Sequence, residues 1–227
     1  MKLLIDSVNL EDIKYLYEYY PIDGVTSNPS LLYKENQNPY KILKEVREFI
    51  GNEAELHVQV VSLDADKMLE EAKMILEELG STTYIKIPVT PEGLKAIATL
   101  AKKNVNVTAT AIYNQMQAYL AAKAGAKYVA PYVNRIDNMG YNGLQVVRQI
   151  QNILDNHNYS TEILGASFKN SNQVLELCEY GVGSVTAAPE VIKGLIKGDM
   201  IYQAVLDFKS DFEELCGKDA TMLNCNK

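Results

Sequence analysis

The chain has 227 residues, a hydrophobic fraction of 47% and a formal net charge of −7. This length suits one α/β barrel, and the hydrophobic fraction is enough to fill a sizeable core. The negative charge and the lack of any lysine or arginine run argue against nucleic acid as a partner. An anionic substrate would need a local positive site against this background.

The cysteines and the apolar segments bear on the compartment. The three cysteines have neither the spacing of a metal site nor that of a disulfide framework, which predicts reduced thiols and no metal centre. The first residues have only three apolar positions in a row before Asp6, unlike a signal peptide. No apolar run approaches the roughly 18 residues of a membrane span. We therefore expect a cytoplasmic protein without a membrane partner.

Two sequence patterns alternate along the chain. Short runs rich in β-branched residues are each followed by a longer stretch whose apolar residues recur every three to four positions. The short runs predict strands at 3–6, 24–28, 56–62, 84–89, 105–112, 128–133, 162–168 and 184–189. The longer stretches predict helices at 9–19, 39–50, 64–79, 91–103, 114–124, 140–156, 170–179 and 189–196.

Eight strand–helix units in a chain of this length indicate the α/β class and favour a (β/α)8 TIM barrel over an open, doubly wound sheet. A further helical pattern over 199–216 follows the eighth unit. No linker or low-complexity segment divides the sequence. We therefore expect residues 1–227 to form a single barrel domain with 199–216 as an additional C-terminal helix.

Polar side chains occur in or just after seven of the predicted strands, where a barrel interior is normally apolar. Active sites of such barrels lie at the carboxyl ends of the strands, so these residues are candidates for a shared site. They are Asp6, Thr26 with Asn28, Gln59, Lys86, Thr110, Tyr132 with Asn134 and Arg135, and Ser167.

Lys86 is the most specific of these candidates. It lies in the strand YIKIPV between two isoleucines. Burial disfavours the charged form of an amine and lowers its pKa, and a neutral amine can attack a carbonyl to form a Schiff base. The alternative is a lysine whose head group reaches water at the end of the strand. The ring of polar neighbours favours the nucleophile.

Other candidates fit roles around such a lysine. A carboxylate at Asp6 can move protons during Schiff-base formation, although Asp6 can equally begin the helix at 9–19. Tyr132 can hold a water or donate a proton, or it can be an ordinary core tyrosine. Gln59 and Thr110 carry no proton-transfer group at neutral pH but can position a water or a hydroxyl.

Arg135 follows the strand predicted at 128–133, and Ser167 ends the strand predicted at 162–168. Barrels often bind phosphate at these late loops. A guanidinium fork with a nearby hydroxyl suits a phosphate monoester. The alternative for Arg135 is an ion pair with Asp137. The two histidines, His57 and His157, receive no catalytic role.

Four segments together resemble the small transaldolase family, in order and spacing, over essentially the whole chain. They are GVTSNPSLL (24–32), YIKIPVTPEGLKAI (84–97), VTATAIYNQMQAYLAAKAGAKYVAPYVNRIDNMGYNG (107–143) and ILGASFKN (163–170). Within the family the chain looks closest to the fructose-6-phosphate aldolase branch. Gln59 stands where transaldolases usually have a glutamate, and Tyr132 stands where those of this size usually have a phenylalanine. The sequence departs from the family at Ser27, usually a threonine, and in SVTAAP (184–189).

The resemblance implies a role for each candidate. Lys86 would form the Schiff base, with Tyr132 as the main proton donor and acceptor. The other implied roles are substrate hydroxyls for Asp6 and Asn28 with Thr26 as a further contact, a catalytic water for Gln59, Thr110 and Tyr132, and the phosphate for Arg135 and Ser167.

The resemblance also implies an activity. The enzyme would cleave fructose 6-phosphate to dihydroxyacetone and glyceraldehyde 3-phosphate, without cofactor or metal. Two alternatives are a transaldolase that moves a dihydroxyacetone unit between sugar phosphates, and a barrel that binds sugar phosphates without covalent chemistry. The expected partners are small-molecule sugar phosphates, dihydroxyacetone and further copies of the chain. The implied homo-oligomer is built from rings, often a decamer, with the helix at 199–216 reaching the adjacent subunit.

Overall fold

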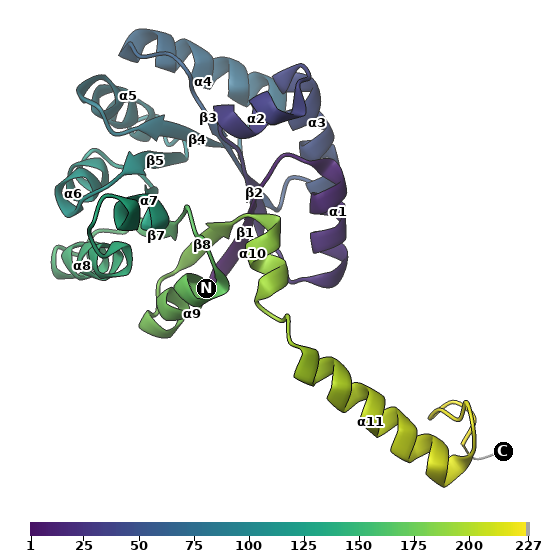
Figure 1. Ribbon diagram of the computed structural model, residues 1–227. Helices are drawn as coiled ribbons and strands as arrows, with labels where there is room; N and C mark the ends of the chain where they lie inside the picture. Colours follow the sequence, from purple (N-terminus) through teal and green to yellow (C-terminus); the bar gives the residue numbers. More distant parts are fainter. Residues whose placement is uncertain (226–227) are drawn as a thin grey trace. The chain divides into compact units, whose positions relative to one another are not determined.

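The computed structural model describes residues 1–225. Eight parallel strands form a closed barrel in which each strand pairs with its neighbours in sequence and β8 pairs with β1 (Figure 1). The strands are β1 (Lys2–Asp6), β2 (Gly24–Thr26), β3 (Glu55–Gln59), β4 (Tyr84–Pro88), β5 (Val107–Ile112), β6 (Tyr128–Pro131), β7 (Glu162–Gly165) and β8 (Ser184–Ala187). The predicted (β/α)8 TIM barrel is confirmed.

Helices follow the strands in turn (Figure 1). They are α1 (Leu10–Tyr19), α2 (Pro29–Glu35), α3 (Pro39–Ile50), α4 (Ala65–Leu79), α5 (Pro91–Ala101), α6 (Gln115–Lys123), α7 (Val133–Asn138), α8 (Gly143–Asn156), α9 (Ser171–Tyr180), α10 (Pro189–Gly194) and α11 (Asp199–Cys216). The additional C-terminal helix is present at its predicted bounds. Among the described residues, no helix is long and apolar enough to cross a membrane.

The chain divides into two compact units, Met1–Ile192 and Lys193–Lys227. The first holds the barrel. The second holds α11, an 18-residue helix in which no residue is buried. Its exposed Ile201, Val205 and Phe208 recur at a spacing of three to four residues. The homo-oligomer implied by the family resemblance stays a prediction.

Two short helices, α2 and α7, were not predicted. Each begins directly after a strand and is only seven or six residues long, too short for a periodic apolar pattern. A local signal did mark the start of α2. The Asn28 side chain accepts a hydrogen bond from the Leu31 N–H at 3.0 Å, and Pro29 occupies the first turn. Asn28 therefore caps a helix at the mouth of the barrel. It lies outside strand β2, although the predicted strand extended to residue 28.

Strand β7 also ends earlier than predicted, at Gly165. Ser167, expected as part of this strand, lies in the loop that follows it with φ at 61°. This left-handed conformation cannot continue a strand, and it is uncommon for any residue other than glycine. The turn carries the Ser167 side chain to the mouth of the barrel.

Alternation along the strands separates two apolar clusters. The larger cluster lies between the sheet and the surrounding helices and includes Ile85 and Ile87. The smaller cluster is inside the barrel and includes Tyr84 and Tyr128. Because successive side chains of a strand point to opposite faces, Lys86 shares the interior face with Tyr84.

A partly buried polar network closes the amino-terminal end of the barrel. The Glu55 carboxylate accepts hydrogen bonds from Lys2 Nζ at 2.7 Å and from the Tyr128 hydroxyl at 3.1 Å. His57 Nε2 lies 3.1 Å from Glu55, and His57 Nδ1 lies 2.8 Å from the Thr108 hydroxyl. Since a carboxylate only accepts, the neutral ring carries its proton on Nε2 and accepts from Thr108. His57 is therefore satisfied within the core.

This network predicts a loss of stability in acid. Burial, opposed by the Glu55 hydrogen bond, lowers the pKa of His57 from 6.5 to about 4. Between these values the unfolded chain binds a proton that the folded chain does not, so stability falls as the pH drops through this window. The expected total is roughly 3 kcal/mol. Although burial raises the pKa of Glu55, its bonds to His57 and Lys2 lower it overall, to about 2, which extends the loss from about pH 4.5 downward.

Urea unfolding at a series of pH values checks this expectation. His57→Gln should flatten the dependence between pH 6.5 and 4, whereas His157→Gln, at an exposed position on the end of α8, should leave it unchanged. An equally steep loss of stability in His57→Gln would show that other groups cause it.

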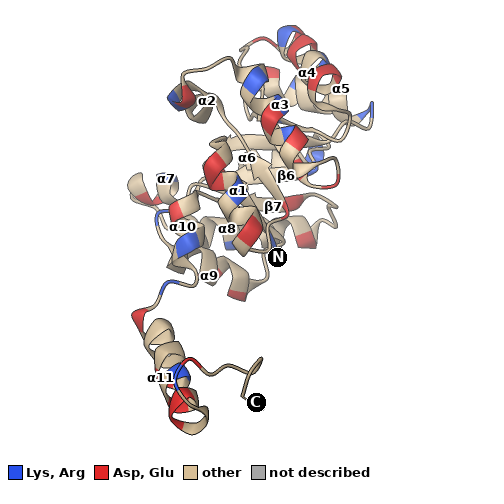
Figure 2. Ribbon diagram, turned by 90° about the vertical axis from the view of Figure 1, so that its right-hand side faces the viewer, with Lys and Arg blue, Asp and Glu red and all other residues tan. Residues whose placement is uncertain are grey.

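Positively and negatively charged residues are interspersed along the outer helices (Figure 2). Lys44 of α3 pairs with Glu78 of α4, and Lys73 lies 3.7 Å from Glu77 along α4. Such exposed pairs contribute little to stability. Because each pair combines one positive and one negative group, neither adds net positive charge for an anionic substrate.

Candidate active site

A cavity of about 390 Å³ opens at the carboxyl ends of the strands. All eight strands, or the loops that follow them, contribute to its lining. The sequence-predicted residues that line it are Asp6, Asn28, Gln59, Lys86, Thr110, Tyr132, Arg135 and Ser167. The structure thus brings together side chains that are far apart in sequence.

Lys86 lies in the wall of this cavity and is 5% exposed. Its Nζ donates a hydrogen bond to the backbone carbonyl of Ser27 at 2.7 Å, so the amine is held inside the barrel and does not extend to bulk water. Burial lowers the pKa of Lys86, and the negative charge of Asp6 opposes this effect. A larger neutral fraction at working pH makes the amine a better nucleophile.

Asp6 ends β1 and faces the same cavity. Its Oδ1 accepts a hydrogen bond from the Thr26 hydroxyl at 2.9 Å. The alternative role, capping α1, belongs to Asn9, whose side chain accepts from the Asp12 N–H at 3.1 Å. The Asp6 carboxylate is therefore available to the cavity.

Tyr132 and Thr110 form a hydroxyl pair on the opposite side of the barrel from β1, with their oxygens 2.8 Å apart. Burial raises the pKa of Tyr132, and the Thr110 hydrogen bond opposes this change. The phenol therefore keeps its proton at neutral pH and can donate it. The ring is fixed by Tyr113, which packs edge-on at 5.6 Å between centroids, and by Arg135, whose guanidinium carbon lies 4.7 Å from its centroid.

The backbone around Tyr132 is held by two left-handed residues. Ala111, at φ 57°, lies where the register between β5 and β6 shifts, and Ser167 has φ 61°. The Tyr132 N–H donates to the Ile112 carbonyl at 3.0 Å, and the Asn134 N–H donates to Ser167 at 2.8 Å. A non-glycine residue in this region costs about 1 kcal/mol or more. Bulges of this kind often aim a side chain at a site.

Arg135 lies at the exposed rim of the cavity. Its Nη1 donates to the Tyr113 hydroxyl at 3.4 Å. The alternative partner, Asp137, instead accepts from the Gly143 N–H at 2.7 Å and from the Gln173 amide at 2.8 Å. The guanidinium therefore supplies positive charge at the mouth of the barrel.

The structure adds residues that were not predicted from the sequence to belong to the site. Ser27 holds Lys86 through a backbone carbonyl, which no residue type reveals. Ala111 lines the cavity because of its backbone conformation. Thr186 lines the cavity from β8, and its inward place in the alternation of SVTAAP is a signal that could have identified it. Thr26, expected to contact substrate, is fully buried and lies outside the lining.

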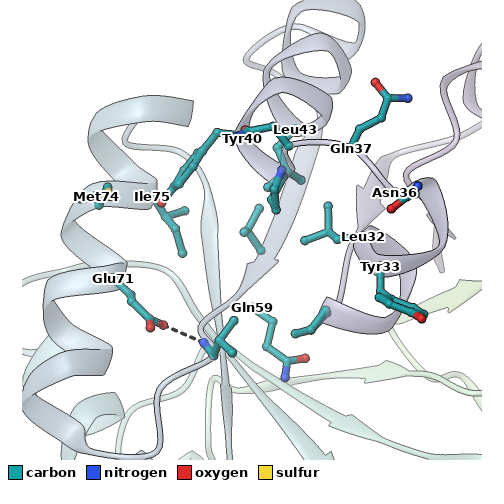
Figure 3. A pocket seen from close by; sticks show the side chains of 15 residues that line it. Leu32, Tyr33, Asn36, Gln37, Tyr40, Leu43, Gln59, Glu71, Met74 and Ile75 are labelled. Carbon is teal, nitrogen blue, oxygen red and sulfur yellow. Dashed lines mark hydrogen bonds between the residues drawn. The ribbon is translucent and has the colours of Figure 1, made fainter.

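A second, larger cavity of about 830 Å³ lies outside the barrel, between α2, α3 and α4. Figure 3 shows Leu32 of α2, Leu43 of α3 and Ile75 of α4 facing into it, with Gln59 at its base. Among the described residues that line it, Glu71 alone is charged, and its carboxylate accepts from the Val61 N–H at 2.7 Å. This cavity lacks the converging reactive groups of the barrel mouth.

Comparison with known proteins agrees with this geometry. Residues 3–223 match the family model described as transaldolase/fructose-6-phosphate aldolase. The chain belongs to this family. The protein is therefore an enzyme of the transaldolase/fructose-6-phosphate aldolase class, and the buried lysine lies within its barrel.

Relatives in the transaldolase/fructose-6-phosphate aldolase family carry two different names. A probable fructose-6-phosphate aldolase from Streptococcus pneumoniae is 41% identical over 213 residues, which are 93% of this chain and 96% of that protein. Probable transaldolases from Thermodesulfovibrio yellowstonii and Symbiobacterium thermophilum are 39% and 37% identical, over 95% and 96% of this chain and 99% and 100% of theirs. Similarity alone therefore does not separate the two activities.

Proposed function

We propose that this enzyme is a Schiff-base aldolase that cleaves fructose 6-phosphate to dihydroxyacetone and glyceraldehyde 3-phosphate, and that catalyses the reverse addition. The observation that carries the proposal is the buried amine of Lys86, with its lowered pKa, in one cavity with Asp6 and the Tyr132–Thr110 pair. The name of the Streptococcus pneumoniae relative supports the same reaction.

The proposed reaction begins at the ketone carbon. The Lys86 amine adds to the carbonyl, and the resulting carbinolamine loses water to give an iminium, with Asp6 moving protons between nitrogen and oxygen. The hydroxyl next to the bond to be cleaved then gives its proton to the Asp6 carboxylate, and the carbon–carbon bond breaks. Its electrons enter the iminium to form an enamine, and the aldehyde leaves. The iminium serves as the electron sink, so the proposed chemistry requires no metal.

The second half of the reaction distinguishes an aldolase from a transaldolase. In an aldolase the enamine carbon takes a proton, and water then hydrolyses the iminium to release dihydroxyacetone and free Lys86. The protonated phenol of Tyr132 is suited to supply this proton, while Thr110 and Gln59 hold the water. In a transaldolase the enamine waits for a second aldehyde. The two relatives named probable transaldolase keep this alternative open.

One assay tests the proposed activity. The enzyme is incubated with fructose 6-phosphate alone, and free dihydroxyacetone is measured over many turnovers. Steady release supports the aldolase. Release that requires an acceptor such as erythrose 4-phosphate would make the enzyme a transaldolase. Binding of sugar phosphate without any borohydride-trapped adduct would instead indicate a barrel without covalent chemistry.

Arg135 and Ser167 are the proposed phosphate contacts. Arg135→Ala should lower kcat/KM for aldol addition to glyceraldehyde 3-phosphate about 10- to 100-fold, because a charge-assisted hydrogen bond contributes about 1.5–3 kcal/mol. Addition to unphosphorylated glyceraldehyde should change little. Arg148→Ala removes an arginine paired with Glu176 outside the cavity and serves as the control. Equal losses with both aldehydes would assign Arg135 a structural role.

A further inference from the structure

We propose that Thr186 and Thr26 form a one-way hydrogen-bond chain that positions the Asp6 carboxylate for catalysis. The inference rests on the proposed function, in which Asp6 moves protons at Lys86. It assigns a role to Thr186, which was not among the residues predicted for the site, and it changes the role expected of Thr26.

The hydrogen-bond chain spans the three strands where the barrel closes. Strand β1 lies between β2 and β8, and Asp6 is directly paired with Thr26 in the register of β1 and β2. The Thr26 hydroxyl lies 2.9 Å from Asp6 Oδ1 and 2.7 Å from the Thr186 hydroxyl. Thr26 is fully buried and Thr186 is 2% exposed, so bulk water does not compete for these bonds.

The donor and acceptor inventory fixes the direction of the chain. A carboxylate has no proton to give, so the bond between Asp6 and Thr26 uses the single proton of the Thr26 hydroxyl. Thr26 then has only lone pairs to offer to its other neighbour. Thr186 must therefore donate to Thr26, which in turn donates to Asp6.

This direction has a consequence for the carboxylate. Of the two Asp6 carboxylate oxygens, Oδ1 has a hydrogen-bond partner within residues 1–225, namely Thr26. The other oxygen, Oδ2, is left to face substrate in the cavity. The hydrogen-bond chain thus selects one rotation of the Asp6 carboxylate about its last side-chain bond. Thr186 acts through Thr26, and Thr26 acts through Asp6, so both are positioning residues.

Two substitutions separate positioning from packing. Valine matches the shape of threonine but has no hydroxyl, whereas serine keeps the hydroxyl and loses a methyl group. For positioning, Thr186→Val should lower kcat for cleavage about tenfold with KM within about threefold, and Thr186→Ser should stay within about threefold of wild type. A packing role predicts the opposite order, because serine leaves a cavity. The opposite order, or equal effects, would overturn the proposal.

The same substitutions at Thr26 complete the test. Thr26→Val should also lower kcat, and Thr186→Val should add little in that background, because its acceptor is already gone. Borohydride trapping of dihydroxyacetone on Lys86 should still go to completion in each variant, which checks that the barrel and its nucleophile are intact. Independent, multiplicative losses in kcat would contradict a chain.

A measurement independent of activity keeps this proposal distinct from the proposed function. Urea unfolding midpoints of wild type, Thr26→Val, Thr186→Val and the double variant form a thermodynamic cycle. A hydrogen-bonded pair predicts that the two shifts do not add, whereas additive shifts would exclude the pair. If wild type neither cleaves fructose 6-phosphate nor traps dihydroxyacetone, the proposed function fails and the positioning role fails with it. The cycle still reports whether the pair exists.

Discussion

Lys86→Ala should lower kcat/KM for cleavage of fructose 6-phosphate by roughly four orders of magnitude, because it removes the proposed nucleophile, on which every later step of the proposed reaction depends. No other amine replaces it, since the cavity lining contains no second lysine among the described residues. The rest of the barrel should fold normally, because alanine at this interior position removes a buried amine that is costly to desolvate.

Borohydride reduction provides the direct measurement. Wild-type enzyme incubated with dihydroxyacetone and then reduced should carry one covalent adduct, which peptide mass spectrometry assigns to Lys86. Lys95→Ala is the matched control, because Lys95 pairs with Asp66 on the outer helices and should neither lose activity nor change the adduct. Intact cleavage in Lys86→Ala, or an adduct on another lysine, would refute the mechanism.

Tyr132→Phe should produce the next largest effect, a loss of about 10²- to 10³-fold in kcat for cleavage with KM within about threefold. The phenol is proposed as the proton donor to the enamine, and a positioned acid or base commonly contributes this much. Burial raises the pKa of Tyr132, so the hydroxyl remains a donor through the neutral range. Schiff-base trapping on Lys86 should persist, because it precedes the step that Tyr132 serves.

The Tyr132→Phe variant also addresses the choice of activity. Transfer of the three-carbon unit to an aldehyde needs no proton on the enamine carbon, so transfer should decline less than release of dihydroxyacetone. Steady-state assays with and without erythrose 4-phosphate measure both. Tyr141→Phe, at an exposed position between α7 and α8, is the control. Unchanged cleavage in Tyr132→Phe would remove this residue from proton transfer.

The barrel could be predicted because its strands and helices differ in apolar period. Short β-branched runs and longer amphipathic stretches alternate eight times, and chain length then favours closure. The short helices α2 and α7 could not be found in this way, because one or two turns carry no measurable period. The predicted end of strand β7 extended too far for a different reason, because Ser167 leaves the strand through a left-handed backbone conformation that the apolar pattern does not indicate.

The candidate site could be predicted where polar side chains interrupt apolar strands. Lys86 between isoleucines and Gln59 at the end of β3 are of this kind, and both line the cavity. Contacts made by the backbone left no such trace. The Ser27 carbonyl that holds Lys86 and the left-handed Ala111 are properties of the folded chain. Neither property can be read from the residue type, because a serine or an alanine occurs in many backbone conformations.

The network of Glu55, His57 and Lys2 closes the barrel at the end opposite the cavity, and this separation matters for engineering. We expect resistance to acid and catalytic rate to depend mainly on different ionisable groups, at different ends of one barrel, although the charge of Lys86 is a minor cause of the lowered pKa of His57. Variants for use in acidic media can therefore be sought at His57 and its partners, without reshaping the substrate pocket. We likewise expect that substitutions at the mouth of the barrel can change selectivity for the aldehyde without removing the acid-sensitive groups.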